Sequence, residues 1–119
     1  MNNPKEKIYY NPRCSKCRQA MKLLKDRGVE PEVIEYMKDT PTVDVLDSIC
    51  SNLGIEPQLL IRTKENRFRE LGLSVNDPLK RSEWLQILVD NPILIERPIF
   101  VSGNKVVIGR PPERVIELL

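Results

Sequence analysis

Two cysteines separated by two residues, Cys14 and Cys17, follow a short β-prone run at residues 7–10. Cys14 stands where this run gives way to a helical pattern. Free backbone N–H groups and the helix dipole stabilise negative charge at the start of a helix, and basic residues flank the pair. We therefore expect Cys14 to be a nucleophilic, redox-active thiol. The alternative is that two small residues simply pack at a helix start.

Cys17 lies roughly one helical turn after Cys14, which makes a disulfide between them sterically reasonable. Such a bond closes a very short loop and would be reduced in a cytosol, so we expect it to form only transiently, as a resolving step after Cys14 has reacted. Cys14 should then be the more exposed of the two thiols. Cys17 also lies on an apolar stripe with Ala20, Met21 and Leu24, so plain core packing is its alternative role.

The chain has three cysteines and no histidine. Without histidine, Ser-His-Asp and Cys-His catalysis are excluded. A zinc site would need two ligands besides the cysteine pair, and only Cys50 remains, on an apolar helical stripe typical of a core residue. We expect no metal.

Three arginines occupy unusual places in the sequence. Arg62 ends an apolar run, Arg97 precedes Pro98 and a β-prone run, and Arg110 follows another β-prone run. Each alone could be a solvated loop residue. Together they suggest an oxyanion site, because guanidinium groups match tetrahedral oxyanions through bidentate hydrogen bonds.

The elements that must position these residues follow from periodicity and turn signals. Strands are predicted at residues 7–10 and 32–36, and a hairpin at 99–101 and 105–108 through a Gly-Asn turn. Helical segments are predicted from Cys17 to a stop at Gly28, from a Thr42 cap to a stop at Gly54, and at 57–60, 68–71, 82–89 and 111–119.

The predicted order is β-α-β, a helical block, then β-β-α. A strand-helix-strand order gives a right-handed crossover and a parallel strand pair. We therefore predict an α/β, thioredoxin-like fold in one domain over residues 1–119, with a helical insertion at about 42–91.

The composition narrows the class of protein. Lys plus Arg number 19 against 17 for Asp plus Glu, a net charge of +2, and this near balance argues against nucleic acid as the partner. No apolar run approaches the roughly 18 residues of a membrane helix, and the polar N-terminal residues do not resemble a signal peptide. We expect a cytoplasmic protein with no membrane association.

Four segments, in order and over nearly the whole chain, resemble the arsenate reductase (ArsC) family of the glutaredoxin-linked type. They are NPRCSKC at residues 11–17, LLIR at 59–62, ERPI at 96–99 and GRPPE at 109–113. The resemblance implies that Cys14 is the nucleophile. It also implies that arsenate is bound by three arginines, Arg62, Arg97 and Arg110.

The same resemblance makes Asn11, Pro12 and Pro98 structural residues of the site, with Pro98 as a cis-proline beside the active cysteine. It further implies that no cofactor is bound, that glutathione is a co-substrate, and that glutaredoxin regenerates the enzyme. Thioredoxin is the variant donor if Cys17 closes an internal disulfide with Cys14.

The chain departs from the arsenate-resistance enzymes of this family. Tyr10 stands where they carry a histidine, Cys17 stands where they carry a hydroxyl residue, and the chain ends at Leu119 without their C-terminal tail. In this it resembles the short, arsenate reductase-like branch.

Two other functions fit part of the pattern. One is a redox-sensing transcriptional regulator of the Spx type, which binds RNA polymerase and shares the C-x-x-C and R-P-I segments; Arg110, in its G-R-P arrangement, argues against it. The other is a general thiol-disulfide reductase, for which three arginines would be excessive.

Overall fold

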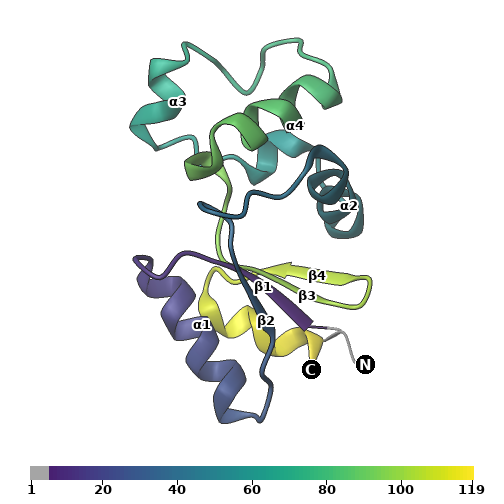
Figure 1. Cartoon of the computed structure of the whole chain (residues 1–119). Coiled ribbons are helices and arrows are strands. Elements are labelled where there is room, and N and C mark those ends of the chain that lie inside the picture. The colour runs from purple at the N-terminus through teal and green to yellow at the C-terminus, as the bar shows by residue number, and fades with distance from the viewer. Residues whose placement is uncertain (1–5) are drawn as a thin grey trace. The chain divides into compact units, whose positions relative to one another are not determined.

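The computed structural model describes residues 6–119, which form two compact units (Figure 1). The sheet unit comprises Met1–Asp39, described from Glu6, together with Arg97–Leu119. The helical unit comprises Thr40–Glu96. The expectation of one domain over residues 1–119 stays a prediction.

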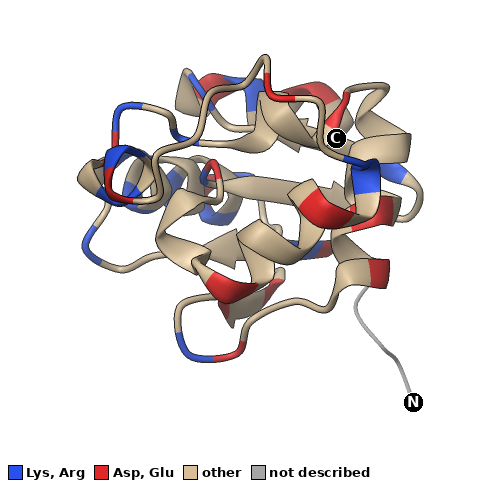
Figure 2. Cartoon of the chain, turned by 90° about the horizontal axis from the view of Figure 1, so that it is seen from above, with Lys and Arg blue, Asp and Glu red and all other residues tan. Residues whose placement is uncertain are grey.

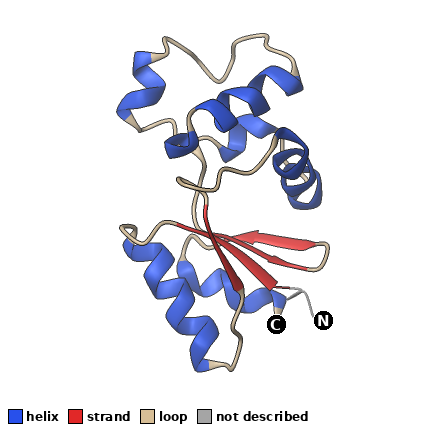
Figure 3. Ribbon diagram, viewed as in Figure 1, coloured by secondary structure: helices blue, strands red, loops and turns tan. Residues whose placement is uncertain are grey.

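The sheet unit contains a four-stranded sheet in the order β2-β1-β3-β4 (Figure 3). Its strands are β1 (Glu6–Tyr10), β2 (Glu32–Glu35), β3 (Ile99–Ser102) and β4 (Lys105–Ile108). β1 and β2 are parallel, whereas β1–β3 and β3–β4 are antiparallel. All four strands were predicted within one residue, and this is the β-α-β plus β-β-α arrangement expected from the sequence.

Two helices, α1 (Ser15–Asp26) and the 3₁₀ helix η3 (Pro112–Leu118), pack together on one face of this sheet (Figure 1). The predicted stripe of α1 is buried: Cys17, Ala20, Met21 and Leu24. These side chains enter a core that includes Ile8, Phe100, Val107 and Val115. Burying this apolar surface is the main favourable contribution to the free energy of folding, and it anchors the start of α1 against the sheet.

The C-terminal helix differs in type from the prediction. An ordinary helix was expected over residues 111–119, and the segment is instead a 3₁₀ helix with i→i+3 bonds such as Arg114 N–H to the Pro111 carbonyl at 3.1 Å. Pro111 and Pro112 do not explain this difference, because the N–H groups at the start of a helix have no intrahelical acceptor in either type of helix.

The helical unit holds three α-helices and two 3₁₀ helices. They are α2 (Val43–Leu53), η1 (Pro57–Leu60), α3 (Asn66–Glu70), α4 (Arg81–Asp90) and η2 (Pro92–Leu94). α2 begins and ends as predicted: the Thr42 hydroxyl accepts a hydrogen bond from Val45 N–H at 3.2 Å, and Gly54 has a φ of 71°.

Helices α2 and α4 pack against each other within this unit. Cys50 of α2 is fully buried, and burial raises its thiol pKa to about 11. The prediction of Cys50 as a core residue is therefore confirmed. Arg81 at the start of α4 pairs with Asp47 of α2 at 2.6 Å.

Basic and acidic residues both occur on the helices and loops (Figure 2), in line with the nearly balanced net charge. Among residues 6–119, no helix is long and apolar enough to cross a membrane.

Candidate active site

Three loops meet at one edge of the sheet: residues 11–14 after β1, 97–98 before β3 and 109–110 after β4. The register places them together, because Tyr9 pairs with Ile99, and Ile99 pairs with Ile108. The end of β1, the beginning of β3 and the end of β4 therefore share one edge. The predicted nucleophile and two of the three predicted arginines lie on these loops.

Local hydrogen bonds fix the loop that carries Cys14. The N–H of Cys14 donates to the Asn11 carbonyl at 2.9 Å, and the Asn11 Oδ1 accepts from Arg13 N–H at 3.0 Å. The Arg18 guanidinium donates to the Pro12 carbonyl at 2.8 Å. Asn11 and Pro12 thus shape the turn that delivers Cys14 to the N-cap position of α1.

Opposing effects set the acidity of Cys14. Burial alone would raise the thiol pKa. Hydrogen bonds from the backbone N–H groups of Cys17 and Lys16, the Arg97 guanidinium and the Cys17 thiol outweigh burial and lower the pKa to about 7. About half of this thiol is therefore ionised at neutral pH.

Cys17 has the opposite character. Its side chain is fully buried, whereas Cys14 is 9% exposed, so the prediction that Cys14 is the more exposed thiol is confirmed. Burial, and then the neighbouring Cys14, raise the pKa of Cys17. Both cysteines are free thiols in this structure. Cys17 therefore stays protonated and donates a hydrogen bond to the Cys14 sulfur.

Two of the predicted arginines contact Cys14. Arg110 has a guanidinium nitrogen 3.8 Å from the Cys14 Sγ, and its Nε donates to the Arg97 carbonyl at 2.7 Å. The Arg97 guanidinium hydrogen-bonds to the Cys14 sulfur. The arrangement places two positive charges, each with several donors, beside one thiolate.

Pro98 lies next to this group. The Arg97–Pro98 peptide bond is cis, as expected, and the Arg110–Pro111 bond is also cis, which was not predicted. Gly109 N–H donates to the Pro98 carbonyl at 2.8 Å, so the loops before β3 and after β4 are tied together.

The third predicted arginine, Arg62, belongs to the helical unit. Its half-buried guanidinium pairs with Glu65 and Glu96, each at 3.1 Å. An isolated antiparallel bridge between Ile61 and Ile95 brings residues 62 and 96 side by side. Neither this bridge nor the two acidic partners was predicted, and the role of Arg62 at the site stays a prediction.

Sequence reasoning missed Tyr36, which directly follows β2. Its side chain is fully buried, and its hydroxyl interacts with the side chains of Arg97 and Asn11. The available signal was positional: β1 and β2 are parallel, so the residue after β2 lies at the same edge as the residue after β1.

A sequence profile of the ArsC family matches residues 9–118. The chain belongs to the ArsC family. It is 45% identical over 114 residues to the uncharacterised protein YfgD of Escherichia coli, and this match covers 95% of each chain. It is 40% identical over 113 residues to the arsenate reductase of Haemophilus influenzae, covering 94% of this chain and 97% of that one.

A solved ArsC-family structure, the arsenate reductase from Vibrio cholerae, superposes with a TM-score of 0.92 at 38% identity. The match covers 99% of this chain and all of that one. The thioredoxin-like α/β fold predicted from the sequence is therefore confirmed.

Gly109 provides a test of how closely the loops of this ArsC site are packed. A Cβ at this position would lie 2.8 Å from the Pro98 Cγ and 3.2 Å from the Val115 Cγ1. We expect Gly109→Ala to lower the free energy of unfolding by about 1–3 kcal/mol in urea titrations, because the proline ring cannot move aside cheaply. It should also change the rate at which Cys14 is alkylated.

The matched control is Gly28→Ala. This position has a φ of 75° and nothing within 4 Å of an added Cβ, so the cost is backbone strain of about 1–2 kcal/mol with no effect on Cys14. Equal Cys14 alkylation rates in the two variants would show that the contact of Gly109 with Pro98 does not matter to the site.

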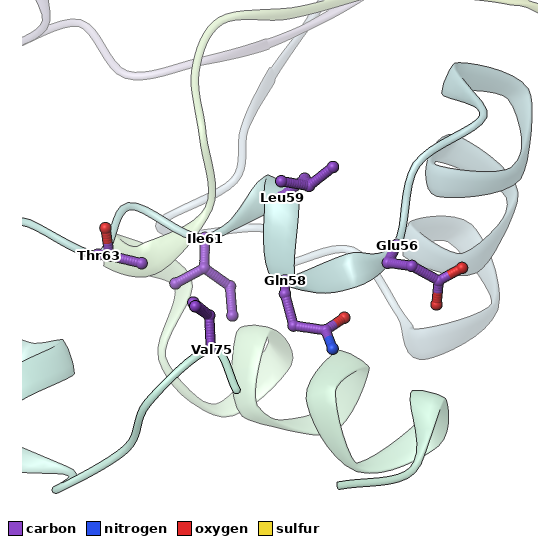
Figure 4. Close-up of a pocket in the computed structure, with 6 residues that line it drawn as sticks. All are labelled: Glu56, Gln58, Leu59, Ile61, Thr63 and Val75. Carbon is purple, nitrogen blue, oxygen red and sulfur yellow. The ribbon is translucent and has the colours of Figure 1, made fainter. Parts of the chain in front are cut away.

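An open pocket of about 480 Å³ lies within the helical unit (Figure 4). Polar and apolar residues line it in equal number, and none of them is a cysteine: Glu56, Gln58, Leu59, Ile61, Thr63 and Val75. The chemistry expected of this chain needs a thiol nucleophile, so we place the candidate active site at Cys14. No cluster of three or more metal-ligating side chains occurs within the part of the chain that the structure describes.

Proposed function

We propose that this protein reduces arsenate, or a closely similar oxyanion, with Cys14 as the nucleophile. The observation that carries the proposal is a single thiol of lowered pKa, about 7, in contact with the guanidinium groups of Arg97 and Arg110. A thiolate alone would serve many reactions. Two adjacent guanidinium groups favour a substrate that is itself a tetrahedral oxyanion.

The proposal also draws on similar proteins of the same family. The relatives from Haemophilus influenzae and Neisseria meningitidis are named arsenate reductases, at 40% and 38% identity over nearly the whole chain. We propose that Arg62 joins Arg97 and Arg110 in binding the anion.

In the first step, the Cys14 thiolate attacks arsenic and forms a sulfur–arsenic bond, while one arsenate oxygen takes up protons and leaves as water. The arginines offset the negative charge of the bound anion and of the adduct. A second thiol then attacks the Cys14 sulfur. The sulfur–arsenic bond breaks, its electron pair stays on arsenic, and arsenite leaves as a disulfide forms. The sum is arsenate plus two thiols giving arsenite, a disulfide and water.

The second thiol has two candidate sources. Glutathione would form a mixed disulfide that glutaredoxin reduces, whereas Cys17 would form an internal disulfide suited to thioredoxin or glutaredoxin. Cys17 supports the internal route because its thiol is already hydrogen-bonded to the Cys14 sulfur. Its raised pKa means that it must lose its proton at the moment of attack. The protein itself would need neither a metal nor an organic cofactor.

The test is arsenate-dependent NADPH consumption, measured with glutathione, glutaredoxin and glutathione reductase, and separately with thioredoxin and its reductase. Wild-type protein should consume NADPH when arsenate is added and should release arsenite. The Cys14→Ser variant should do neither. Turnover of a disulfide substrate without any response to arsenate would favour a general thiol-disulfide reductase. Binding to RNA polymerase with no turnover in either system would favour the Spx-type regulator.

We expect Cys17→Ser to lose the internal disulfide and to depend on glutathione for turnover. Serine keeps the size of the buried side chain but cannot attack a sulfur atom. Mass spectrometry of protein oxidised by arsenate or mild peroxide in the presence of glutathione should find Cys14 joined to Cys17 in the wild type, and Cys14 joined to glutathione in the variant. Cys50→Ser is the control, because Cys50 is a buried cysteine of the helical unit. If wild type and Cys17→Ser behave alike with both donors, Cys17 only packs the core.

A further inference from the structure

Tyr36 stands at the edge of the sheet where the candidate site is built. Tyr10, the last residue of β1, pairs with Glu35, the last residue of the parallel strand β2. The next residues of the two strands, Asn11 and Tyr36, are therefore neighbours at the same end of the sheet. This edge also receives Arg97, which lies two residues before β3.

The hydroxyl of Tyr36 lies within a group of polar side chains. The ring is completely buried, among the largest fully buried side chains of the described chain. Arg97 and Asn11 both interact with the hydroxyl, and Arg97 reaches the Cys14 sulfur as well. Burial raises the pKa of Tyr36, and it outweighs the opposing effects of Arg97 and Asn11. The hydroxyl is therefore protonated at neutral pH.

We propose that Tyr36 is a positioning residue, whose hydroxyl holds the Arg97 guanidinium in the orientation that serves Cys14 and the bound oxyanion. The part of this inference that concerns the oxyanion rests on the proposed function. The part that concerns the Cys14 thiolate does not, because Arg97 hydrogen-bonds to that sulfur without any substrate.

The physical need for such a residue comes from the arginine side chain. A guanidinium on a flexible stem loses about 2 kcal/mol of rotamer entropy when it is held in one orientation. A rigid aromatic ring, fixed by complete burial, is a suitable partner because it has few torsions to lose. Asn11 is the second partner of the same hydroxyl, so Tyr36 also links Arg97 to the turn that carries Cys14.

The experiment compares Tyr36→Phe with wild-type protein in two measurements. The first is the rate of Cys14 alkylation by iodoacetamide as a function of pH. The second is the protection of Cys14 at constant ionic strength by phosphate or sulfate, oxyanions that the thiol does not reduce. We expect Tyr36→Phe to raise the pH midpoint and to weaken protection by about five- to tenfold, the size of effect expected when a buried charged group loses one polar partner.

Tyr9→Phe is the matched control. Tyr9 is also buried, at 6% exposure, but the charged groups that act on its hydroxyl are Glu32 and Asp39. Tyr9→Phe therefore removes a buried tyrosine hydroxyl, as Tyr36→Phe does, but from a residue whose charged neighbours do not include Arg97. If both variants unfold at similar urea concentrations and show the same midpoint and protection, Tyr36 only fills space and the proposal is wrong.

A double-mutant cycle with Arg97→Lys tests whether Tyr36 acts through Arg97. In the Arg97→Lys background, Tyr36→Phe should change neither measurement by more than about twofold, which is the usual scatter of a double-mutant cycle. An unreduced effect of Tyr36→Phe would overturn the assignment. If neither anion protects Cys14 even in the wild type, the oxyanion site of the proposed function fails, and the pH midpoints still decide the role of Tyr36.

Discussion

At neutral pH, iodoacetamide should alkylate Cys14 at least about 100-fold faster than Cys50, with a midpoint near pH 7. The two thiols have pKa values of about 7 and about 11, a difference of about 10,000-fold in acid dissociation. A thiolate of low pKa is intrinsically less nucleophilic, which offsets about half of this on a logarithmic scale. The burial of Cys50 slows its reaction further.

The sign of the pH dependence follows from which form reacts. Below pH 7 the Cys14 thiol is protonated, so its rate should fall about tenfold for each pH step of one; well above pH 7 the rate should level off. Rates are read by mass spectrometry of peptides from pulse-labelled protein, with Cys14→Ser as the control that removes the fast site. A midpoint at the free-thiol value of about 8.5, or equal labelling of Cys50, would contradict the assignment of Cys14 as nucleophile.

Local sequence patterns were enough to predict the elements that carry the site. The stripe of Cys17, Ala20, Met21 and Leu24 is buried as a unit because a helix places residues three and four apart on one face. The hairpin forms where Gly-Asn separates two β-branched runs, with Ser102 opposite Lys105. These features depend on neighbours in sequence, which a single chain reveals.

Contacts between residues distant in sequence could not be predicted in the same way. Tyr36 resembles any strand-end aromatic residue until the parallel register places it beside Asn11 and Arg97. The ion pair between Arg62 and Glu96 spans 34 residues and depends on a bridge between Ile61 and Ile95. Apolar spacing cannot predict this bridge, because both of its isoleucines lie in segments that read as short apolar runs.

The pKa of Cys14 depends both on local features that the sequence reveals and on contacts between distant residues that it does not. The helix start was visible in the sequence, and two backbone N–H groups of that first turn do lower the pKa. The Arg97 guanidinium and the buried thiol of Cys17 contribute as well, and burial opposes them all. The direction could therefore be predicted from the sequence, whereas the balance that sets the value near 7 needed the three-dimensional structure.

Arg110→Ala should weaken the protection of Cys14 by phosphate or sulfate by about 10- to 150-fold. The figure is the 1.5–3 kcal/mol expected for hydrogen bonds to a charged group. The variant should also raise the Cys14 midpoint, because a guanidinium nitrogen of Arg110 lies 3.8 Å from the Cys14 sulfur and favours its charged form. Loss of anion binding with a smaller midpoint shift than an Arg97 variant shows would separate the role of Arg110 from that of Arg97, which is among the largest causes of the lowered Cys14 pKa.

The matched control for this prediction is Arg114→Ala. Arg114 lies four residues further on in η3, is about half exposed and pairs with Glu117 at 3.6 Å. Both variants lose one positive charge from the same segment, so any effect of net charge alone is equal in the two, and constant ionic strength limits long-range screening differences. Arg62→Ala completes the series and tests whether the helical unit supplies a third donor. If the anion protects Cys14 in Arg110→Ala as well as it does in Arg114→Ala, the assignment of Arg110 to an anion site is wrong. The Spx-type regulator then becomes the better explanation of the cysteine pair.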